Sequence, residues 1–222
     1  MKTSIFLLLV LASSVFAQKT FDLKNASKYF DVKVRVAKCD DEFCSGKATF
    51  SFYKKGALTA YQVINLPDTL IQLDGSKPLV NDTLLYDEQS VIDVGDYNFD
   101  GMEDVAICKG ANGSYGMPAY NIYLSSRAAG KFVYSAAFSK LGSHLGMFTV
   151  DRKEKTLETF DKSGCCWHIT ERYKVVNDRP VKVFEEVEDA TADPNGKRVK
   201  VTTKKLLAGK WKTSVRYEKA EQ

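Results

Sequence analysis

An acidic stretch near the middle of the chain has the residue types and the spacing of a calcium-binding loop. Oxygen-bearing side chains occupy the first, third, fifth and ninth positions of Asp96–Asp104, and Gly101 occupies the sixth. Calcium is a hard cation that binds six to eight oxygen atoms, and alternate residues of a tight loop can direct their side chains at one centre. The pattern predicts that Ca²⁺ is bound by Asp96, Asn98, Asp100, Asp104 and the backbone carbonyl of Met102.

The residues that follow distinguish this loop from a helix–loop–helix site. The twelfth position, where a bidentate Glu is usual, is Ile107, and the apolar segment 104–108 is typical of a strand. Unless a residue from elsewhere or water completes the shell, we expect weak binding, on the order of 10⁻⁴ to 10⁻³ M. The ion would then have a structural role, in which it neutralises clustered Asp charges. The alternative is an acidic surface turn without a metal.

A glycine-rich segment follows the expected strand and is the second candidate site. Lys109–Pro118 contains three glycines, an Asn and a Pro, a composition that predicts a long loop. Binding residues concentrate on such loops. Ser114 and Tyr115 at its centre offer two hydroxyl groups and one aromatic ring. The alternative is a connecting loop without a binding role.

Evidence for catalysis is weak. His144 and His168 are the only histidines, and Gly142-Ser143-His144 lacks the pattern of a nucleophile elbow. The chain contains neither a phosphate loop nor a dinucleotide-binding fingerprint. Carboxylates are plentiful, but no feature selects a catalytic pair. We therefore predict that the protein is not an enzyme.

The first 17 residues resemble a secretory signal peptide. Lys2 provides the positive start, residues 5–11 form the apolar run, and Val15-Phe16-Ala17 is a cleavage site of the small-x-Ala type. The apolar run is too short to span a bilayer, and no later run is long enough. We predict a soluble periplasmic or secreted protein that begins at Gln18, without a membrane span and monomeric.

The charge balance argues against nucleic acid as a partner. The formal net charge of +4 falls to +3 when Lys2 is removed with the signal peptide, since Lys2 is the only charged residue of that segment. Lysine and arginine are interleaved with Asp and Glu, whereas nucleic-acid binding requires a clustered basic excess. The mature chain, residues 18–222, has a length that suits a single domain.

All the cysteines lie in the mature chain: Cys39, Cys44, Cys108, Cys165 and Cys166. Export favours disulfides, and Cys39 and Cys44 are expected to pair across a short acidic loop. A bond between the neighbours Cys165 and Cys166 would be strained, so we expect one of them to reach Cys108 and the other to remain odd. A metal cluster of Cys165, Cys166 and His168 is the alternative.

Hydrophobic alternation predicts strands along most of the chain. Expected strands cover residues 29–38, 48–53, 58–64, 120–124, 132–137, 166–176, 181–187, 199–207 and 211–217. Turn residues separate them at a spacing of about ten residues, which favours an all-β sandwich, barrel or propeller. We expect one domain over residues 18–222, with N-terminal strands in residues 18–80 and a calcium-binding part in residues 85–190.

Several of these features together resemble known proteins. The loop 96–104 that enters a strand looks like the calcium loops of FG-GAP/VCBS-type β-propeller blades. The wider span, with the loop 112–116, Tyr120–Leu124 and Ser163–His168, resembles small calcium-binding periplasmic proteins of Gram-negative bacteria that inhibit animal-type lysozyme. The resemblance covers residues 85–190 and implies an antiparallel, irregular, small propeller-like all-β fold.

The resemblance also implies a partner and a mode of inhibition. A protruding loop enters the cleft of host lysozyme, and the counterpart here is Gly113, Ser114, Tyr115 and Gly116. The calcium loop and a Cys108 bridge would form the rigid base of that loop. Animal lysozymes are strongly basic, whereas this chain is mildly basic, so acidic residues such as 40–42 would have to supply local complementarity. The alternative is a calcium-stabilised binding module of the cell envelope with no inhibitory activity.

Overall fold

The computed structural model describes residues 18–82 and 89–220, and the expected signal peptide lies outside these ranges. The described chain is all-β, as predicted, with strands β1 to β16, one short α-helix and two 3₁₀ turns. The strands form three antiparallel sheets, none of which closes into a barrel. No helix within the described ranges is long and apolar enough to cross a bilayer.

The first sheet is built from the N-terminal strands. Its members are β1 (Lys19–Leu23), β2 (Phe30–Cys39), β3 (Phe43–Lys54), β4 (Gln62–Leu66), β5 (Leu70–Asp74) and β6 (Lys77–Pro78). The order is β1-β2-β3-β5-β6, and β4 also pairs with β3. Alternate residues of β2 and β3 are buried, as expected for strands that bury one face.

The second sheet is a meander of four strands. It contains β7 (Ile92–Gly95), β8 (Asp104–Cys108), β9 (Tyr120–Ser126) and β10 (Lys131–Tyr134) in the order β10-β9-β8-β7. The 3₁₀ turn η1 (Ser114–Gly116) lies between β8 and β9, and α1 (Ala136–Leu141) packs against β9.

The third sheet is a meander of the remaining strands in chain order. It contains β11 (Phe148–Asp151), β12 (Thr156–Ser163), β13 (Trp167–Val176), β14 (Arg179–Asp189), β15 (Arg198–Leu207) and β16 (Lys210–Lys219), with the 3₁₀ turn η2 (Ala190–Ala192) after β14. Every residue of β16 is exposed. No residue of β13 or β14 is fully buried either, so the outer part of this sheet has solvent on both faces.

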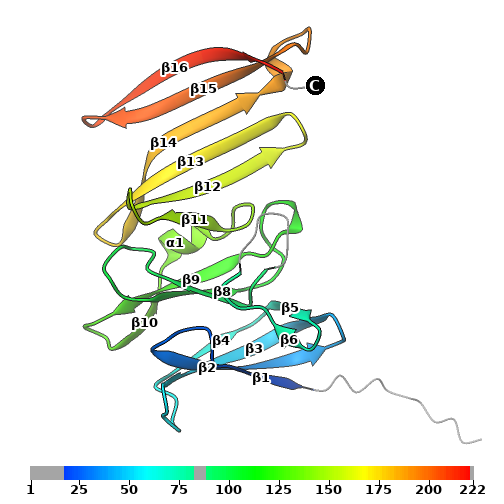
Figure 1. The fold of residues 1–222 in the computed structure, drawn as a ribbon, viewed down its shortest axis with the longest axis vertical. Helices are drawn as coiled ribbons and strands as arrows, with labels where there is room; N and C mark the ends of the chain where they lie inside the picture. Colours follow the sequence, from blue (N-terminus) through cyan, green and yellow to red (C-terminus); the bar gives the residue numbers. More distant parts are fainter. Residues whose placement is uncertain (1–17, 83–88, 221–222) are drawn as a thin grey trace, which may run out of the picture.

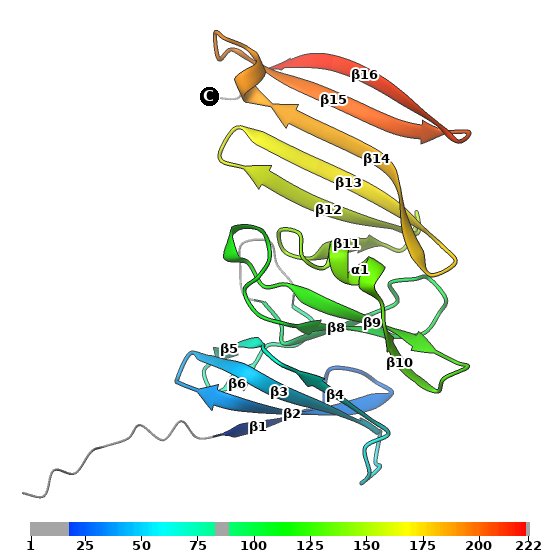
Figure 2. The ribbon, with the colours of Figure 1, turned by 180° about the vertical axis from the view of Figure 1, so that it is seen from behind.

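The three sheets follow one another along the long axis of the molecule (Figures 1 and 2). One hydrophobic core lies between the first and second sheets, and another joins the second sheet to α1, β11 and β12. All of β8 is buried. Its side chains alternate between the cores, with Val105 and Ile107 in the first and Ala106 and Cys108 in the second.

The expected strand over 132–137 is only partly right. Strand β10 ends at Tyr134, and Ser135 begins α1 by accepting a hydrogen bond from the backbone N–H of Phe138 to its side-chain oxygen. Ser is a favoured helix N-cap because its hydroxyl satisfies one of the free N–H groups of the first turn. Phe138 and Leu141, three residues apart, are both buried, which is the spacing of a helix face.

Candidate functional site

The predicted calcium loop connects β7 to β8 and is closed by the pairing of Gly95 with Asp104. The carboxylate of Asp96 accepts hydrogen bonds from the backbone N–H groups of Asp100 at 3.0 Å and Gly101 at 2.9 Å. Gly101 has a φ of 85°, a conformation in which a glycine avoids the strain of a Cβ. The spacing of the loop thus produces the tight bend that the sequence predicts.

Asp104 is the buried carboxylate of this loop. Its Oδ2 accepts from the backbone N–H of Tyr97 at 2.9 Å, and its Oδ1 accepts from that of Ser125 at 2.8 Å. Desolvation by burial raises the pKa of Asp104 to about 7, and these hydrogen bonds oppose that rise. The side chain therefore ties the loop to both β8 and β9.

The donor chemistry of the loop fits a hard cation, because every expected ligand is an oxygen. Each carboxylate oxygen that accepts one N–H keeps a second lone pair for a metal. However, residues 18–82 and 89–220 contain no group of three or more His, Cys, Asp or Glu side chains placed to hold a metal ion. The amide of Asn98 also donates to Asp178 Oδ1 at 2.8 Å. Calcium therefore stays a prediction, with Asp96, Asn98, Asp100, Asp104 and the Met102 carbonyl as the residues that would bind it.

The glycine-rich loop after β8 is ordered by its own backbone. The N–H of Lys109 donates to the carbonyl of Ala119 at 2.8 Å, and the N–H of Gly113 donates to the carbonyl of Met117 at 2.8 Å. A Cβ on Gly113 would lie 2.8 Å from that same carbonyl oxygen, so a larger residue would force the loop apart. The loop is therefore a closed hairpin-like structure with η1 at its tip.

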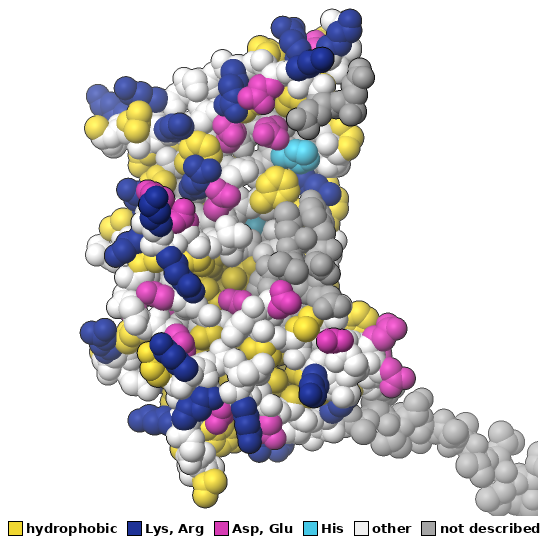
Figure 3. Space-filling view, in the orientation of Figure 1, with side chains coloured by type: hydrophobic (Ala, Val, Ile, Leu, Met, Phe, Trp, Pro, Cys, Tyr) yellow, Lys and Arg dark blue, Asp and Glu magenta, His cyan; other side chains and the backbone are white. Residues whose placement is uncertain are grey.

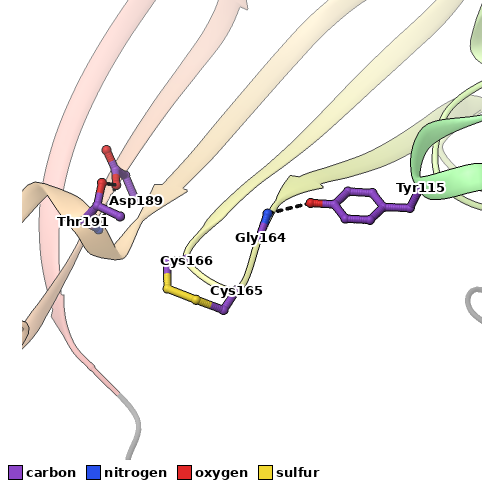
Figure 4. Close-up of a disulfide and its surroundings, with 6 residues drawn as sticks. All are labelled: Tyr115, Gly164, Cys165, Cys166, Asp189 and Thr191. Carbon is purple, nitrogen blue, oxygen red and sulfur yellow. Dashed lines mark hydrogen bonds between the residues drawn. A yellow bond between two sulfur atoms is a disulfide. The ribbon is translucent and has the colours of Figure 1, made fainter.

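Tyr115 is presented at this tip. Its φ is 58°, in the left-handed region that is uncommon for an aromatic residue, and its side chain is 60% exposed. The phenolic oxygen accepts a hydrogen bond from the backbone N–H of Gly164 at 2.6 Å (Figure 4). The ammonium of Lys162 lies 5.2 Å from the centre of the ring. An exposed aromatic ring is thus fixed in position by a second segment of the chain.

That second segment is the turn between β12 and β13, which contains Cys165 and Cys166. The two neighbours form a disulfide with each other, so the expected bridge from one of them to Cys108 is wrong. Cys108 is a free, buried thiol in the core beside α1, whereas the turn lies at the end of β12. Because both turn cysteines are oxidised, the alternative metal cluster with His168 is also wrong. The pairing of Cys39 with Cys44 is confirmed.

The two candidate loops lie at opposite ends of β8. The calcium loop enters the strand and the glycine-rich loop leaves it, so they lie on opposite sides of the molecule (Figure 1). Five strand residues span roughly 15 Å. The expectation that calcium and a Cys108 bridge form the base of the glycine-rich loop is therefore wrong. The base is instead the β12–β13 turn, which the sequence does not connect with Tyr115.

Acidic side chains lie on the same side as the glycine-rich loop. The turn between β2 and β3 carries Asp40, Asp41 and Glu42, all of them exposed. It lies along the same long edge of the molecule as the loop (Figures 1 and 2). Hydrogen bonds from the backbone N–H groups of Phe43 and Glu42 lower the pKa of Asp40, so its carboxylate stays charged.

Comparisons with known proteins support the fold. No protein-family model matches the chain, and no curated protein matches it. Among solved structures, a Xanthomonas type IV secretion system related protein is similar to this chain, with a TM-score of 0.65 and 24% sequence identity. The match covers 89% of this chain and 97% of the other. At this identity the likeness establishes a shared architecture.

Proposed function

We propose that the protein is a periplasmic calcium-binding inhibitor of animal-type lysozyme that inserts the loop Gly113–Gly116 into the enzyme's active-site cleft. The observation that carries the proposal is Tyr115, which is 60% exposed and held at its hydroxyl by Gly164. The proposal also rests on the family resemblance of residues 85–190. The two disulfides agree with an oxidising compartment outside the cytoplasm.

The chemistry of the tip suits a glycosidase cleft. Lysozyme cuts glycosides with two carboxyl groups, one of which is protonated. Tyr115 accepts a hydrogen bond from Gly164, so its own proton is free to be donated to a carboxylate. The hydroxyl of Ser114 makes no hydrogen bond to the residues that the structure describes, and it can donate in the same way. Neither group offers a glycosidic bond to cleave.

Rigidity favours this mode of binding. A loop that is already held in its bound shape loses less conformational entropy on association than a mobile one. Here the backbone bonds within the loop and the Tyr115–Gly164 bond hold that shape. The acidic turn 40–42 on the same edge would steer the inhibitor toward a basic enzyme, despite the positive net charge of the whole chain.

Calcium and the propeller-like arrangement belong to the same proposal. The second sheet is a four-stranded antiparallel meander, which is the size and strand order of one propeller blade. The calcium loop precedes β8, the strand that leads to the glycine-rich loop. Bound Ca²⁺ would neutralise Asp96, Asp100 and Asp104 and thereby fix the end of β8 that begins at Asp104.

The direct test is muramidase activity of a basic animal lysozyme titrated with mature protein in calcium. Stoichiometric loss of activity is expected. If several lysozyme classes remain fully active, the inhibitor proposal is wrong, and a calcium-stabilised envelope-binding module without inhibitory activity takes its place. Pull-down from envelope extracts would then search for the partner.

A matched pair of tyrosines tests the role of the loop. The double variant Ser114→Ala/Tyr115→Ala should lower the affinity for lysozyme at least a hundredfold, because roughly 3 kcal/mol is typical for losing a central anchor. Tyr29→Ala is the control, since Tyr29 is 61% exposed and also has a lysine over its ring at 4.8 Å. Equal losses in both variants would show that the loop does not bind the enzyme.

Calcium titration tests the metal part separately. Calorimetry should detect one weak site with a dissociation constant of about 10⁻⁴ to 10⁻³ M. The variant Asp100→Asn should weaken it further, whereas Asp151→Asn, at the exposed end of β11 in the third sheet, should not. Because the two loops lie at opposite ends of β8, EDTA should reduce inhibition less than the Tyr115 variant does. If calorimetry detects no heat of calcium binding in any titration, calcium is not part of the proposed function.

A further inference from the structure

The hairpin of β15 and β16 ends in a tip that combines exposed apolar side chains with lysines. The tip is the sequence Lys204-Lys205-Leu206-Leu207-Ala208-Gly209-Lys210-Trp211-Lys212, which we call the β15–β16 tip. Leu207 is 48% exposed and Trp211 is 45% exposed. Basic and hydrophobic side chains gather at this corner of the molecule in the space-filling view (Figure 3). A position at one end of the long axis leaves the tip free of neighbouring sheets (Figure 1).

Of the four lysines of the tip, only Lys204 forms an ion pair within the described residues. Lys205 lies directly across from Lys212 in the strand pairing, an arrangement in which like charges repel. Within the described residues, Lys205, Lys210 and Lys212 form no ion pair, whereas Lys204 is paired with Glu185 at 2.7 Å. This local excess of positive charge contrasts with the mixed surface of the rest of the chain.

The turn itself keeps the tip apolar. Ala208 and Gly209 have φ values of 49° and 76°, as in a two-residue turn that usually takes Asn, Asp or Gly at its first position. Ala is strained there, because its Cβ crowds the backbone. Because the turn residues are Ala208 and Gly209, no polar side chain lies at the end of the hairpin, between Leu207 and Lys210.

We propose that the β15–β16 tip is a peripheral membrane-binding site that docks on a bilayer rich in anionic phospholipid. Lysines near such a surface are attracted to its headgroups, and Trp is enriched where headgroups meet acyl chains. Leu206 pairs with Trp211 on one face of the hairpin, and Leu207 with Lys210 on the other, so apolar groups project at the end of both faces. The lysines flank them at the depth of the phosphates.

An acidic protein strand is the other class of partner that the charge could attract. The observations favour lipid, because lysines along an open edge hinder the addition of another strand. The exposed Leu207 and Trp211 at the end of the hairpin would also gain little from an acidic strand, whereas an anionic bilayer offers them an apolar interior. Docking by the tip would leave the Gly113–Gly116 loop, on the other long edge of the molecule, open to solvent (Figure 1).

Vesicle sedimentation tests this inference with the mature protein. The protein should bind vesicles of phosphatidylcholine with phosphatidylglycerol and not vesicles of phosphatidylcholine alone. Each lysine near an anionic surface contributes about a fivefold increase in partitioning. Replacing Lys205, Lys210 and Lys212 with Gln should therefore lower binding roughly a hundredfold. The control replaces Lys24, Lys47 and Lys131, which are exposed in or next to the strands of the first two sheets, and should change binding little.

Fluorescence distinguishes lipid contact from attraction to any polyanion. In a Trp167→Phe protein, Trp211 is the only tryptophan, and its emission should shift to shorter wavelength on anionic vesicles.

Leu207→Asn should lower binding several-fold without changing the circular dichroism spectrum. Equal loss in the tip and control triple variants would overturn the proposal. So would unshifted emission together with full competition by soluble polyphosphate or by an acidic protein. Lysozyme inhibition in solution should be unchanged in the tip variants, which keeps this test separate from that of the proposed function.

Discussion

The N-terminal and C-terminal parts of the molecule both contain a six-stranded antiparallel sheet, but they are stabilised differently. Strands β2 and β3 alone bury Phe30, Val32, Val34, Val36, Cys44, Ala48, Phe50 and Phe52. In the described part of the third sheet, the buried hydrophobic residues are Phe148, Leu157 and Val201. The first region has a core between two sheets, whereas β13 to β16 extend from the second core as a single layer.

The single layer depends on its own strand pairing and on polar contacts between strands. Glu185 accepts hydrogen bonds from Lys182 at 2.6 Å and from Lys204 at 2.7 Å, so that β14 and β15 are joined by a lysine–glutamate–lysine network. Cross-strand pairs of this kind contribute about 0.2–1 kcal/mol each. Long, well-paired strands can therefore form where hydrophobic burial is small, and both of their faces remain accessible to solvent.

The largest expected effect is in the first core. Phe50→Ala should lower the free energy of unfolding by about 3–5 kcal/mol, because Phe50 is fully buried at the centre of β3. Val215→Ala in β16, where the side chain is 53% exposed, should change it by less than about 0.5 kcal/mol. Urea titration followed by circular dichroism measures both. If the two variants lose similar amounts of unfolding free energy, the contrast between a packed core and a single layer is contradicted.

Leu157 tests the junction between the two regions. It is fully buried in the second core and pairs with Val150 and Tyr173 in the neighbouring strands. Leu157→Ala should cost about 3 kcal/mol and should accelerate amide hydrogen exchange in β13 to β16 more than in β2 and β3. Val181→Ala, 42% exposed in β14, is the control. Uniform acceleration across the chain would show that the regions unfold as one unit.

Glu185 tests the polar network through pH. Hydrogen bonds from Lys182 and Lys204 lower the pKa of Glu185 below its ordinary value of 4.5. A carboxyl with a lowered folded-state pKa stabilises the protein above its unfolded pKa, and that stabilisation is lost as pH falls through the folded pKa. Glu185→Gln should therefore cost about 1 kcal/mol at pH 7 and almost nothing near pH 2.

Thermal melts at both pH values measure this difference. Glu218→Gln is the control, since Glu218 is 52% exposed and, among the residues that the structure describes, pairs with Arg216 alone. Its melting temperature should differ little from that of the unchanged protein at either pH. A loss in Glu185→Gln that persists undiminished in acid would show that its carboxylate charge is not responsible.

The smallest effect is expected at the β15–β16 turn. Ala208→Asn should raise stability by about 0.5 kcal/mol, because Asn tolerates the left-handed conformation that Ala208 adopts. Gly209→Ala should lower it by about 1 kcal/mol, because Gly209 has a φ of 76°. Differential scanning calorimetry resolves changes of this size. If both substitutions raise stability, or both lower it, the turn geometry described above is contradicted.

The alternation of apolar residues predicted the all-β class and most strands, because one buried face imposes a period of two on the sequence. It did not predict α1, since the three-residue spacing of Phe138 and Leu141 is too short a signal to compete with the preceding strand pattern. The Ser135 cap is the feature that could have found it.

Contacts between distant segments could not be read from local patterns. The tight bend of the loop 96–104 follows from its own residues, whereas the support of Tyr115 comes from Gly164, far along the chain. The pairing of Cys39 with Cys44 was predictable because the strands are joined by a short turn. The isolation of Cys108 was not, because it depends on how α1 and β12 pack over β8.

Strand β8 also constrains how the sequence can change during evolution. Its larger side chains, Val105 and Ile107, face one core, and its smaller ones, Ala106 and Cys108, face the other. One inserted or deleted residue would exchange the two sets, overfilling one core and leaving cavities in the other. Related proteins should therefore vary in the length of the loops at either end while keeping the spacing between them constant, so that each loop can diversify without disturbing the other.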